Sequence, residues 1–548
     1  MDRTELSSAI IQEMQALVGE ALEAVVPALL TADLAMLEQR VQQVGRVILG
    51  GLVERVAAGH AQGLPRPARC PACAGPLKRR ERPRPLVGLV GDYTLHRAYY
   101  WCAACTRGAA PLDAALGLGP GEVSPGLARV VARAAVEATF TPAAEQVQEA
   151  LGATLSDETV RRLAERIGAA AEAQTQAAIA RAQHGQLVWT DDEVERAEDS
   201  TILAVEVDGV LVQQGAGWHE MKVATVAPLG PALHTDPDSG RTHLAWGAAS
   251  YGVGAEAAED CWWRVHVEAL RRGLGTPAVR TVVVLADGAR WIWDRARAVL
   301  GLPGVEVVEI ADIYHAYGYL WAVGNALHGA GSLRATAWVE PLTDQLYRHG
   351  AAPVLAALAA LEPTTAEALT AIDDARTYFT RNAARMDYPR FVARQLPIGS
   401  GAVESSCKCV VEARLTQAGM RWGVPGSQAI ASLRALHRSG RWAAFWQTHP
   451  DRYQPPTADA APPTPRVPPP PRPVPPSRQR LRYPPPRRVS PRQQLPRAPR
   501  HVPHPRPPSV RCSCPAPRRG NFAVAHPTGR AICACPRWSR MRCLRCAG

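Results

Sequence analysis

The chain has 548 residues, enough for two or three domains, and a net charge of +12 that is spread unevenly. From Asp451 to the C-terminus there are 20 Arg, no Lys and two Asp, so the tail carries +18 and the first 450 residues carry −6. A basic tail attracts nucleic acid or another polyanion. No apolar run reaches the roughly 18 residues of a membrane span, and the N-terminus lacks a secretory signal. These features exclude membrane and secreted classes, and we expect a cytoplasmic protein with no membrane partner.

The N-terminal 62 residues are predicted to be helical, because apolar residues recur at steps of three and four. Ile10, Met14 and Leu17 lie in the first run, and a second run spans residues 34–56. The sequence PRPARC then ends the pattern. Residues 1–62 are therefore interpreted as a separate helical segment.

Two C-x-x-C pairs follow in residues 63–118, namely Cys70 with Cys73 and Cys102 with Cys105. In a reducing compartment such paired spacing favours a tetrahedral four-thiolate zinc site over disulfides. The intervening PLVGLVGDYTLHRAYY is typical of a hairpin, so we predict a zinc ribbon. All four zinc positions would be filled by protein, which indicates a structural ion. The alternative is a set of buried thiols that bind no metal.

Residues 119–185 return to the helical period. The stretch LSDETVRRLAERIG begins at a capping Ser156 and follows EQVQEALGAT, which together resemble a helix-turn-helix. Arg161 and Arg162 would then be available for DNA. The other interpretation, an ordinary helical hairpin with solvated arginines, stays open because short helix pairs are common.

From Thr201 the pattern changes to strands alternating with helices, which predicts an α/β domain over residues 198–450. The predicted strands are TILAVEVDGVLVQQ, MKVATVAPL, HLAWGAAS, TVVVLADGA and VEVVEIAD. Residues 256–273, WIWDRARAVLG and YHAYGYLWAVGNALHG are predicted helices. Residues 330–395 are predicted to be wholly helical, as are residues 401–445 apart from a turn near GMRWGVPGS.

Three acidic residues lie where a rigid scaffold can hold catalytic carboxylates: Asp208 within the first strand, Asp287 at the end of TVVVLAD, and Glu404 early in a helix. A charge inside an apolar strand is costly unless something compensates it. Both Asp residues precede Gly, so each could instead form a turn. The apolar pattern nevertheless continues past Asp208, which favours a strand that continues or bulges there. Glu206 shares the strand face of Asp208, and we assign it a secondary role.

Four blocks of the chain resemble a bacterial insertion-sequence transposase of the ISKra4 type. They are VEVDGVLVQQGAGWHEMKVATV, LADGARWIWDRARAVL, EIADIYHAYGYLW and PIGSGAVESSCKCVVEARLTQAGMRW. The resemblance covers roughly residues 60–446 and implies a DDE transposase with a ribonuclease-H-like mixed sheet flanked by helices. The helical stretch at about 320–395 resembles the all-α insertion of such enzymes.

By this resemblance Asp208, Asp287 and Glu404 form the catalytic triad. They would hold two Mg²⁺ ions, or Mn²⁺, for cleavage and strand transfer at phosphorus. Asp312 and His315 match a D-x-x-H signature of related transposases, and we expect them to contact DNA or support the site. Asp312 could alternatively be a helix N-cap, and His315 a core histidine.

Further candidates for DNA contact are Arg414, Arg421 and Trp422, of which Trp422 could equally lie in the core. Cys407 and Cys409 are interpreted as buried thiols, since residues two apart on a helix face different ways. The expected partners are the element's terminal repeats and target DNA, bound by a homodimer or larger assembly.

Residues 451–548 contain more than half of the 49 Pro and are predicted to be a disordered basic tail. The tail could add DNA affinity, form a second cysteine site from three closely spaced pairs, or be read-through from a GC-rich gene. Two other functions stay open for the whole chain. One is a catalytically silent zinc-containing DNA-binding protein, and the other is a ribonuclease-H-like nuclease without strand transfer.

Overall fold

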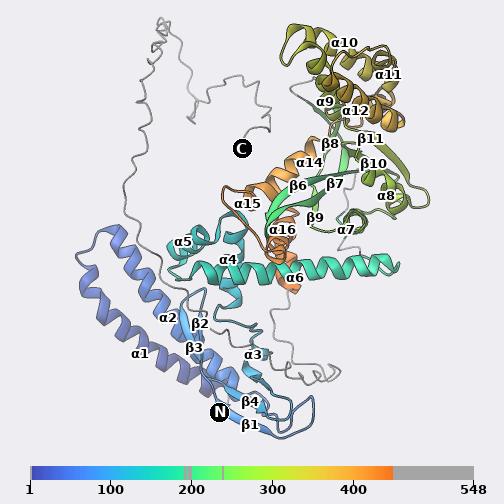
Figure 1. The fold of residues 1–548 in the computed structure, drawn as a ribbon. Helices are drawn as coiled ribbons and strands as arrows, with labels where there is room; N and C mark the ends of the chain where they lie inside the picture. Colours follow the sequence, from blue (N-terminus) through green and yellow to red (C-terminus); the bar gives the residue numbers. More distant parts are fainter. Residues whose placement is uncertain (1–2, 191–193, 196–199, 237–239, 449–548) are drawn as a thin grey trace, which may run out of the picture. The chain divides into compact units, whose positions relative to one another are not determined.

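The computed structural model describes residues 3–190, 194–195, 200–236 and 240–448. The predicted basic tail and its six cysteines lie outside these residues. All described residues fall in one compact unit, Met1–Pro465. Within it, the chain combines many helices with a mixed sheet (Figure 1).

The helices before the main sheet are α1 (Arg3–Leu29), α2 (Leu34–Gln62), α3 (Pro111–Ala115), α4 (Pro125–Glu137), α5 (Phe140–Leu151) and α6 (Asp157–Gln183). Those within and after it are α7 (Ala258–Arg271), α8 (Arg290–Leu300), α9 (Ile313–His328), α10 (Leu333–His349), α11 (Ala351–Ala359), α12 (Ala366–Asn382), α13 (Tyr388–Ala393), α14 (Gly401–Ser406), α15 (Ala413–Leu415), α16 (Val424–Arg438) and α17 (Trp442–Thr448). A 3₁₀ turn, η1 (Ala383–Arg385), and a π-helix, η2 (Cys407–Glu412), complete the helical elements.

Two small sheets surround the cysteines. Strands β1 (Leu77–Glu81), β4 (Ala98–Cys102) and β5 (Arg107–Ala109) form an antiparallel sheet in the order β1-β4-β5. Strands β2 (Arg84–Val87) and β3 (Asp92–Leu95) form a separate antiparallel pair. The sheets confirm hairpin-like sequence between the two cysteine pairs.

The main sheet has six strands: β6 (Ile202–Gln214), β7 (Gly217–Thr235), β8 (Thr242–Trp246), β9 (Ser250–Gly254), β10 (Thr281–Ala286) and β11 (Glu306–Ala311). Their order is β11-β10-β6-β7-β8, and β9 also pairs with β7. Strands β6 to β9 are antiparallel neighbours, whereas β10 and β11 run parallel to β6. The predicted strand HLAWGAAS (residues 243–250) contains β8 and ends at the first residue of β9, so β9 was not predicted.

Strand β6 passes straight through Asp208 and Gly209, which pair with Val223 and Lys222 of β7 without a register shift. The hairpin turn lies instead at Gly215, whose φ is +57°. The sequence DG at Asp208 is therefore not a turn, and the strand does not bulge there. At the second DG the chain does turn, since Gly288 has a φ of +102°.

Helices cover both faces of the sheet. Alternate residues of β6, β10 and β11 point to the two sides, as the period of a strand requires. Leu203, Val205 and Val282 pack against α7 and α8 on one side. Ala204, Leu285 and Ile310 pack against α9, α12 and α13 on the other.

Helices α4, α5 and α6 share a hydrophobic core with α16 and with the C-terminal half of β6, at Val210 and Val212. The approach of α6 to α16 is very close: a Cβ added at Gly168 would lie 2.1 Å from the carbonyl oxygen of Ala429. The helix-turn-helix-like segment is thus packed onto the α/β body. Within the described part of the chain, no helix is both long enough and apolar enough to cross a membrane.

Candidate functional site

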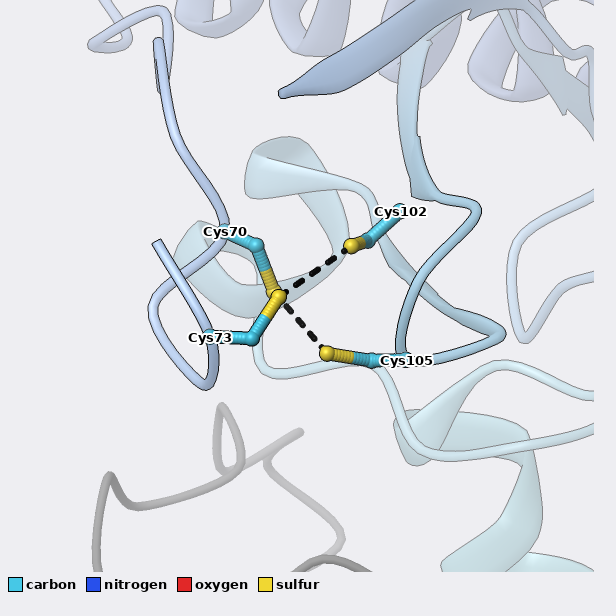
Figure 2. A group of neighbouring side chains, drawn as sticks. All are labelled: Cys70, Cys73, Cys102 and Cys105. Carbon is cyan, nitrogen blue, oxygen red and sulfur yellow. Dashed lines mark hydrogen bonds between the residues drawn. The ribbon is translucent and has the colours of Figure 1, made fainter. Parts of the chain in front are cut away.

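The four predicted cysteines converge on one point. The sulfurs of Cys70, Cys73, Cys102 and Cys105 all lie within 4.8 Å of one another (Figure 2). Sγ of Cys70 is 3.8 Å from that of Cys105, and Sγ of Cys73 is 3.5 Å from that of Cys102. Four thiols at this spacing fit the shell of a tetrahedral ion such as zinc.

The backbone around each pair has the same form. Ala74 follows the first pair with a φ of +55°, and Thr106 follows the second with a φ of +53°. A non-glycine residue rarely adopts this left-handed conformation, which marks a local constraint. In the first loop the Ala74 amide donates to the carbonyl of Cys70, and the amide of Cys70 donates to that of Gly75. These hydrogen bonds close the first loop around the sulfurs of Cys70 and Cys73.

The thiols differ in acidity. The amide of Ala72 donates to Cys70 and lowers its pKa to about 7, although burial acts in the opposite direction. Hydrogen bonding to Cys73 raises the pKa of Cys105 to about 12. Neighbouring thiols that hydrogen-bond to one another do not all ionise on their own. A bound metal ion would favour the thiolate form of all four. The cluster thus has the donor set and the electrostatics of a metal site.

A second group of titratable residues lies on one face of the main sheet. Pairing between β6 and β10 aligns Glu206 with Leu285, so Asp208 is level with Asp287 two residues further on. Pairing between β10 and β11 aligns Ala286 with Ala311, so Asp287 is level with Asp312. Asp208 of β6 and the residues directly after β10 and β11, Asp287 and Asp312, thus lie at one level when the two registers are extended past the strand ends. We refer to Glu206, Asp208, Asp287 and Asp312 as the carboxylate row.

Asp208 occupies the central strand of the row and is partly buried. Its Oδ1 accepts a hydrogen bond from the amide of Gly209 (2.7 Å), and the thiol of Cys407 donates to its Oδ2 (3.9 Å). Burial and the nearby charge of Asp287 raise the pKa of Asp208. A carboxylate whose ionisation is disfavoured by burial and by a neighbouring carboxylate is suited to binding a cation.

Asp287 and Asp312 shape the loops that follow β10 and β11. Oδ1 of Asp287 accepts from the amide of Ala289 (2.8 Å). Asp312 caps α9 by accepting from the amide of Tyr314 (2.7 Å), and its other oxygen accepts from the hydroxyl and the amide of Ser400. Both residues therefore have turn or cap roles, as the alternative interpretation proposed. The contact with Ser400 also joins Asp312 to the segment that carries Glu404.

Glu206 is more central than the sequence suggested. Its side chain is fully buried, and its Oε2 accepts from the amide of Val403 at the start of α14 (2.6 Å). Its Oε1 has no partner, and burial raises its pKa well above the ordinary value. The available signal was its position two residues before Asp208 on the same face. It anchors α14 to the sheet.

Glu404 lies on α14 but points away from the row. Its carboxylate forms an ion pair with Lys408 one helical turn later (2.7 Å), and the side chain is 67% exposed. Among the residues that the structure describes, the cysteine cluster is the only group of three or more such side chains gathered closely enough to share an ion. In this conformation the predicted triad is not assembled.

The remaining candidates divide into exposed and buried residues. His315 and Arg421 are exposed, so His315 is not a core histidine. Arg414 is 1% exposed, its Nε donates to the carbonyl of Ala135 (3.2 Å), and its guanidinium stacks between Phe140 and Trp422. Burial lowers its pKa to about 10. Trp422 is also buried. Contact with DNA at Arg414 or Trp422 would require this packing to open.

The predicted recognition helix is the first part of α6. Arg161 is held by two carboxylates of its own helix, Glu158 (2.7 Å) and Glu165 (2.7 Å). Arg162 is 67% exposed and lies 3.5 Å from Glu158. Arg161 is therefore neutralised locally, whereas Arg162 extends into solvent.

Comparison with known proteins gives one result. Residues 28–299 match the model of an uncharacterised protein family, UPF0236. The UPF0236 match, just under half of the chain, begins before α2 and ends within α8. It includes the cysteine cluster, α4–α6, Asp208 and Asp287, and it stops before Asp312 and Glu404. No curated protein matches the chain.

Proposed function

We propose that this protein is a DDE transposase of a bacterial insertion sequence, which binds the ends of its element and catalyses metal-dependent strand cleavage and strand transfer. The observation that carries the proposal is the carboxylate row. Asp208 and Asp287 lie level on adjacent parallel strands, on a sheet whose strand order is β11-β10-β6-β7-β8. A ribonuclease-H-like core has an antiparallel set of three strands followed by parallel strands on the other side of the first, and this order agrees with it.

Divalent metal fits the row chemically. Mg²⁺ prefers hard oxygen ligands and keeps several waters, so a few carboxylates and the DNA phosphates suffice. Two such ions activate the attacking hydroxyl and stabilise the leaving oxygen of an in-line displacement. Burial and the charge of Asp287 raise the pKa of Asp208, and a bound divalent cation would favour its charged form. We assign Asp208 and Asp287 as ligands, with Mn²⁺ as a possible substitute for Mg²⁺.

Glu404 completes the proposed triad only after a side-chain change. Its partner Lys408 is itself 62% exposed, and exposed pairs of this kind contribute about 0.3–0.5 kcal/mol. Release of Glu404 is therefore inexpensive. The start of its helix is already fixed to the row, because Val403 donates to Glu206 and Ser400 donates to Asp312. We propose that Glu404 turns toward the row when metal and DNA bind.

The other parts take supporting roles in this proposal. The cysteine cluster is a zinc ribbon with a structural ion, and α10 to α13 form the helical insertion that precedes Glu404. Arg162, His315 and Arg421 are exposed and are assigned to DNA contact. Asp312 orients the Glu404 segment through Ser400.

Self-association is also part of the proposal, because two DNA ends must be paired. Helix α2 exposes a stripe of apolar side chains at helical spacing, which a second copy could cover. The stripe consists of Leu34, Leu37, Val41, Leu49, Leu52 and Val56. A mass measured by light scattering should correspond to a dimer or larger, and Leu37→Glu with Leu52→Glu should shift it to the monomer.

The decisive experiment uses the purified full chain with labelled DNA copied from the sequences that flank its gene. We expect Mg²⁺-dependent nicking and a joined product, both abolished by Asp208→Asn and by Asp287→Asn. Glu172→Gln, a buried carboxylate away from the row, is the matched control and should remain active if folded. Nicking without joining would favour the nuclease alternative. DNA binding with no metal-dependent cleavage would favour the catalytically silent alternative and overturn the proposal.

A further inference from the structure

The cysteine-cluster region differs in charge from the body around it. Residues 64–109 contain nine Lys or Arg and only two acidic residues, a net charge of +7. Because residues 1–450 together carry −6, the remainder of that body carries −13. A basic module on an acidic body is not the result of overall composition. The positive charge is concentrated where a polyanion would be bound.

Part of this charge lies on one face of the sheet β1-β4-β5. Lys78 pairs with Trp101, and Arg80 pairs with Tyr99. Directly opposite residues of an antiparallel pair share a face, so cations and aromatic rings alternate there. Lys78 and Arg80 are exposed, and Tyr99 and Trp101 are partly exposed. We call this the cationic-aromatic face.

The side chains on the opposite face of the sheet are buried or form ion pairs. Tyr100 and Cys102 are buried, and Arg79 forms an ion pair with Glu81. A cavity of about 220 Å³ on that side is lined by Arg79, Tyr100 and residues at the end of α2. The cationic-aromatic face is therefore the outer surface of the sheet.

The cations of the outer face have no internal counter-charge. Among the described residues, no carboxylate pairs with Lys78, Arg80 or Arg82, whereas Arg84 and Arg97 are both held by Asp113. The guanidinium of Arg82 lies 5.2 Å from the ring centre of Tyr99. The Tyr99 ring in turn lies across Gly108 of β5, where an added Cβ would come 2.3 Å from the tyrosine oxygen. A side chain at Gly108 would displace the ring.

We propose that the cationic-aromatic face binds DNA, with Lys78, Arg80 and Arg82 on phosphates and with Tyr99 and Trp101 against bases or sugars. Phosphate contacts supply most non-specific affinity, and aromatic rings provide stacking surfaces that accept any base. This deepens the proposed function by placing a DNA grip on the cysteine-cluster region, at a distance in sequence from Arg161 and Arg162. The structural ion then has a purpose, because it fixes the strand β4 that carries both rings.

The test measures DNA binding by fluorescence anisotropy, using a labelled duplex and a labelled single strand without Mg²⁺. The triple variant Lys78→Ala, Arg80→Ala, Arg82→Ala should bind the duplex roughly 10- to 100-fold more weakly. Loss of three phosphate contacts should make the slope of log K against log salt shallower by about 2.7. The control Arg297→Ala, Arg348→Ala, Arg376→Ala removes the same formal charge from other exposed helices and should change little.

Single substitutions separate the two parts of the face. Trp101→Leu should weaken binding of the single strand about 5- to 150-fold while the salt slope stays unchanged. Zinc content, measured for every variant, establishes that the cysteine cluster is intact. Equal loss in the triple variant and its control would overturn the inference, as would no loss in the triple variant.

The predicted loss of DNA binding in the triple variant does not depend on catalysis. The Asp208→Asn background should show the same dependence on Lys78, Arg80 and Arg82, because no carboxylate of the row takes part in binding here. A protein that binds DNA through this face but never cleaves it would retain the inference and lose the proposed transposase activity.

Discussion

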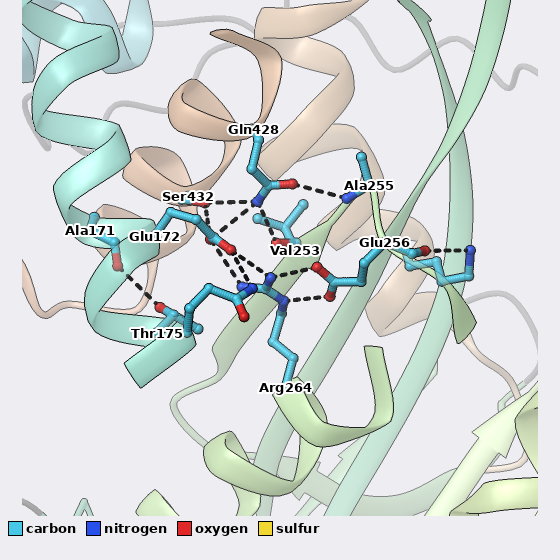
Figure 3. Close-up of polar contacts among 11 residues, drawn as sticks. Ala171, Glu172, Thr175, Val253, Ala255, Glu256, Arg264, Gln428 and Ser432 are labelled. Atoms are coloured by element: carbon cyan, nitrogen blue, oxygen red, sulfur yellow. Dashed lines mark hydrogen bonds and ion pairs between the residues drawn. The ribbon is translucent and has the colours of Figure 1, made fainter. Parts of the chain in front are cut away.

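Two polar clusters in the α/β body both contain largely buried carboxylates, but only one of them contains a cationic side chain. In the first, which we call the Arg264 cluster, a guanidinium that is 3% exposed lies between the carboxylates of Glu172 (2.8 Å) and Glu256 (2.6 Å) (Figure 3). Gln428 and Ser432 of α16 complete it by donating to Glu172 (3.2 and 2.7 Å). The carboxylate row has four acids, and among the described residues no arginine or lysine is a hydrogen-bond partner of any of them.

The difference shows in the acidity of each cluster. In the Arg264 cluster, burial opposes ionisation of Glu172, yet Arg264 outweighs it and the pKa of Glu172 is lowered. In the row, burial raises the pKa of Asp208 and of Glu206. Carboxylates whose charge is compensated by a cationic side chain stabilise a fold. Carboxylates with raised pKa values and no such partner are candidates for binding a cation. The Arg264 cluster therefore has the charge balance of a structural site, and the proposed metal site rests on the contrasting charge of the row.

The largest expected effect on stability comes from Arg264. Arg264 of α7 pairs with Glu172 of α6 and with Glu256, so Arg264→Leu would leave two largely buried carboxylates without their cationic partner. Breaking a buried pair in this way costs about 3–5 kcal/mol. Urea unfolding followed by circular dichroism should show this loss. Arg290→Leu, at an 84% exposed position, should change the free energy of unfolding by less than about 0.5 kcal/mol.

The second prediction concerns metal and the row. A ligand that binds only the folded state stabilises it by RT ln(1 + [L]/Kd), about 1.4 kcal/mol at ten times Kd. Mg²⁺ should therefore raise the melting temperature of the wild type and not that of Asp208→Asn. Without metal, Asp208→Asn should be at least as stable as the wild type, since it removes an uncompensated charge. An equal response of both proteins to Mg²⁺ would contradict a site at Asp208.

The third prediction is a pH dependence of the Arg264 cluster. Because the pKa of Glu172 lies below its ordinary value of 4.5, its stabilising effect is present above that value and is lost as the pH falls through the lowered pKa. Wild type and Glu172→Gln should differ in the free energy of unfolding at pH 7, and the difference should shrink toward pH 3. A gap that stays constant over this range would show that Glu172 does not act through its charge.

Most secondary structure could be predicted from the sequence, because its periodicities are strong. Strands β6, β10 and β11 are almost continuous apolar runs, and the spacing of the four cysteines predicted their cluster. Strand β9 was missed, since its sequence SYGVG is short and contains two glycines, which are depleted in strands.

The candidate site was harder to predict from the sequence than the secondary structure. The sequence placed Asp208 and Asp287 at suitable points, but their alignment depends on the register between parallel strands that are about 70 residues apart. The burial of Glu206 and Arg414 depends on tertiary packing of α14 and α4, which local pattern does not encode. Arg414 was a candidate for DNA contact, and its position over the ring of Phe140 could not be inferred from spacing.

The smallest expected change in stability is at Glu404. Its ion pair with Lys408 is exposed on both sides, so Glu404→Gln should alter the free energy of unfolding by no more than about 0.5 kcal/mol. The same substitution should abolish Mg²⁺-dependent cleavage if Glu404 joins the row on metal binding. Glu412→Gln, on the same helical segment, is the matched control and should leave cleavage intact. Cleavage that survives Glu404→Gln would restrict the metal site to Asp208 and Asp287, and would remove the need for the Glu404 side chain to turn toward the row.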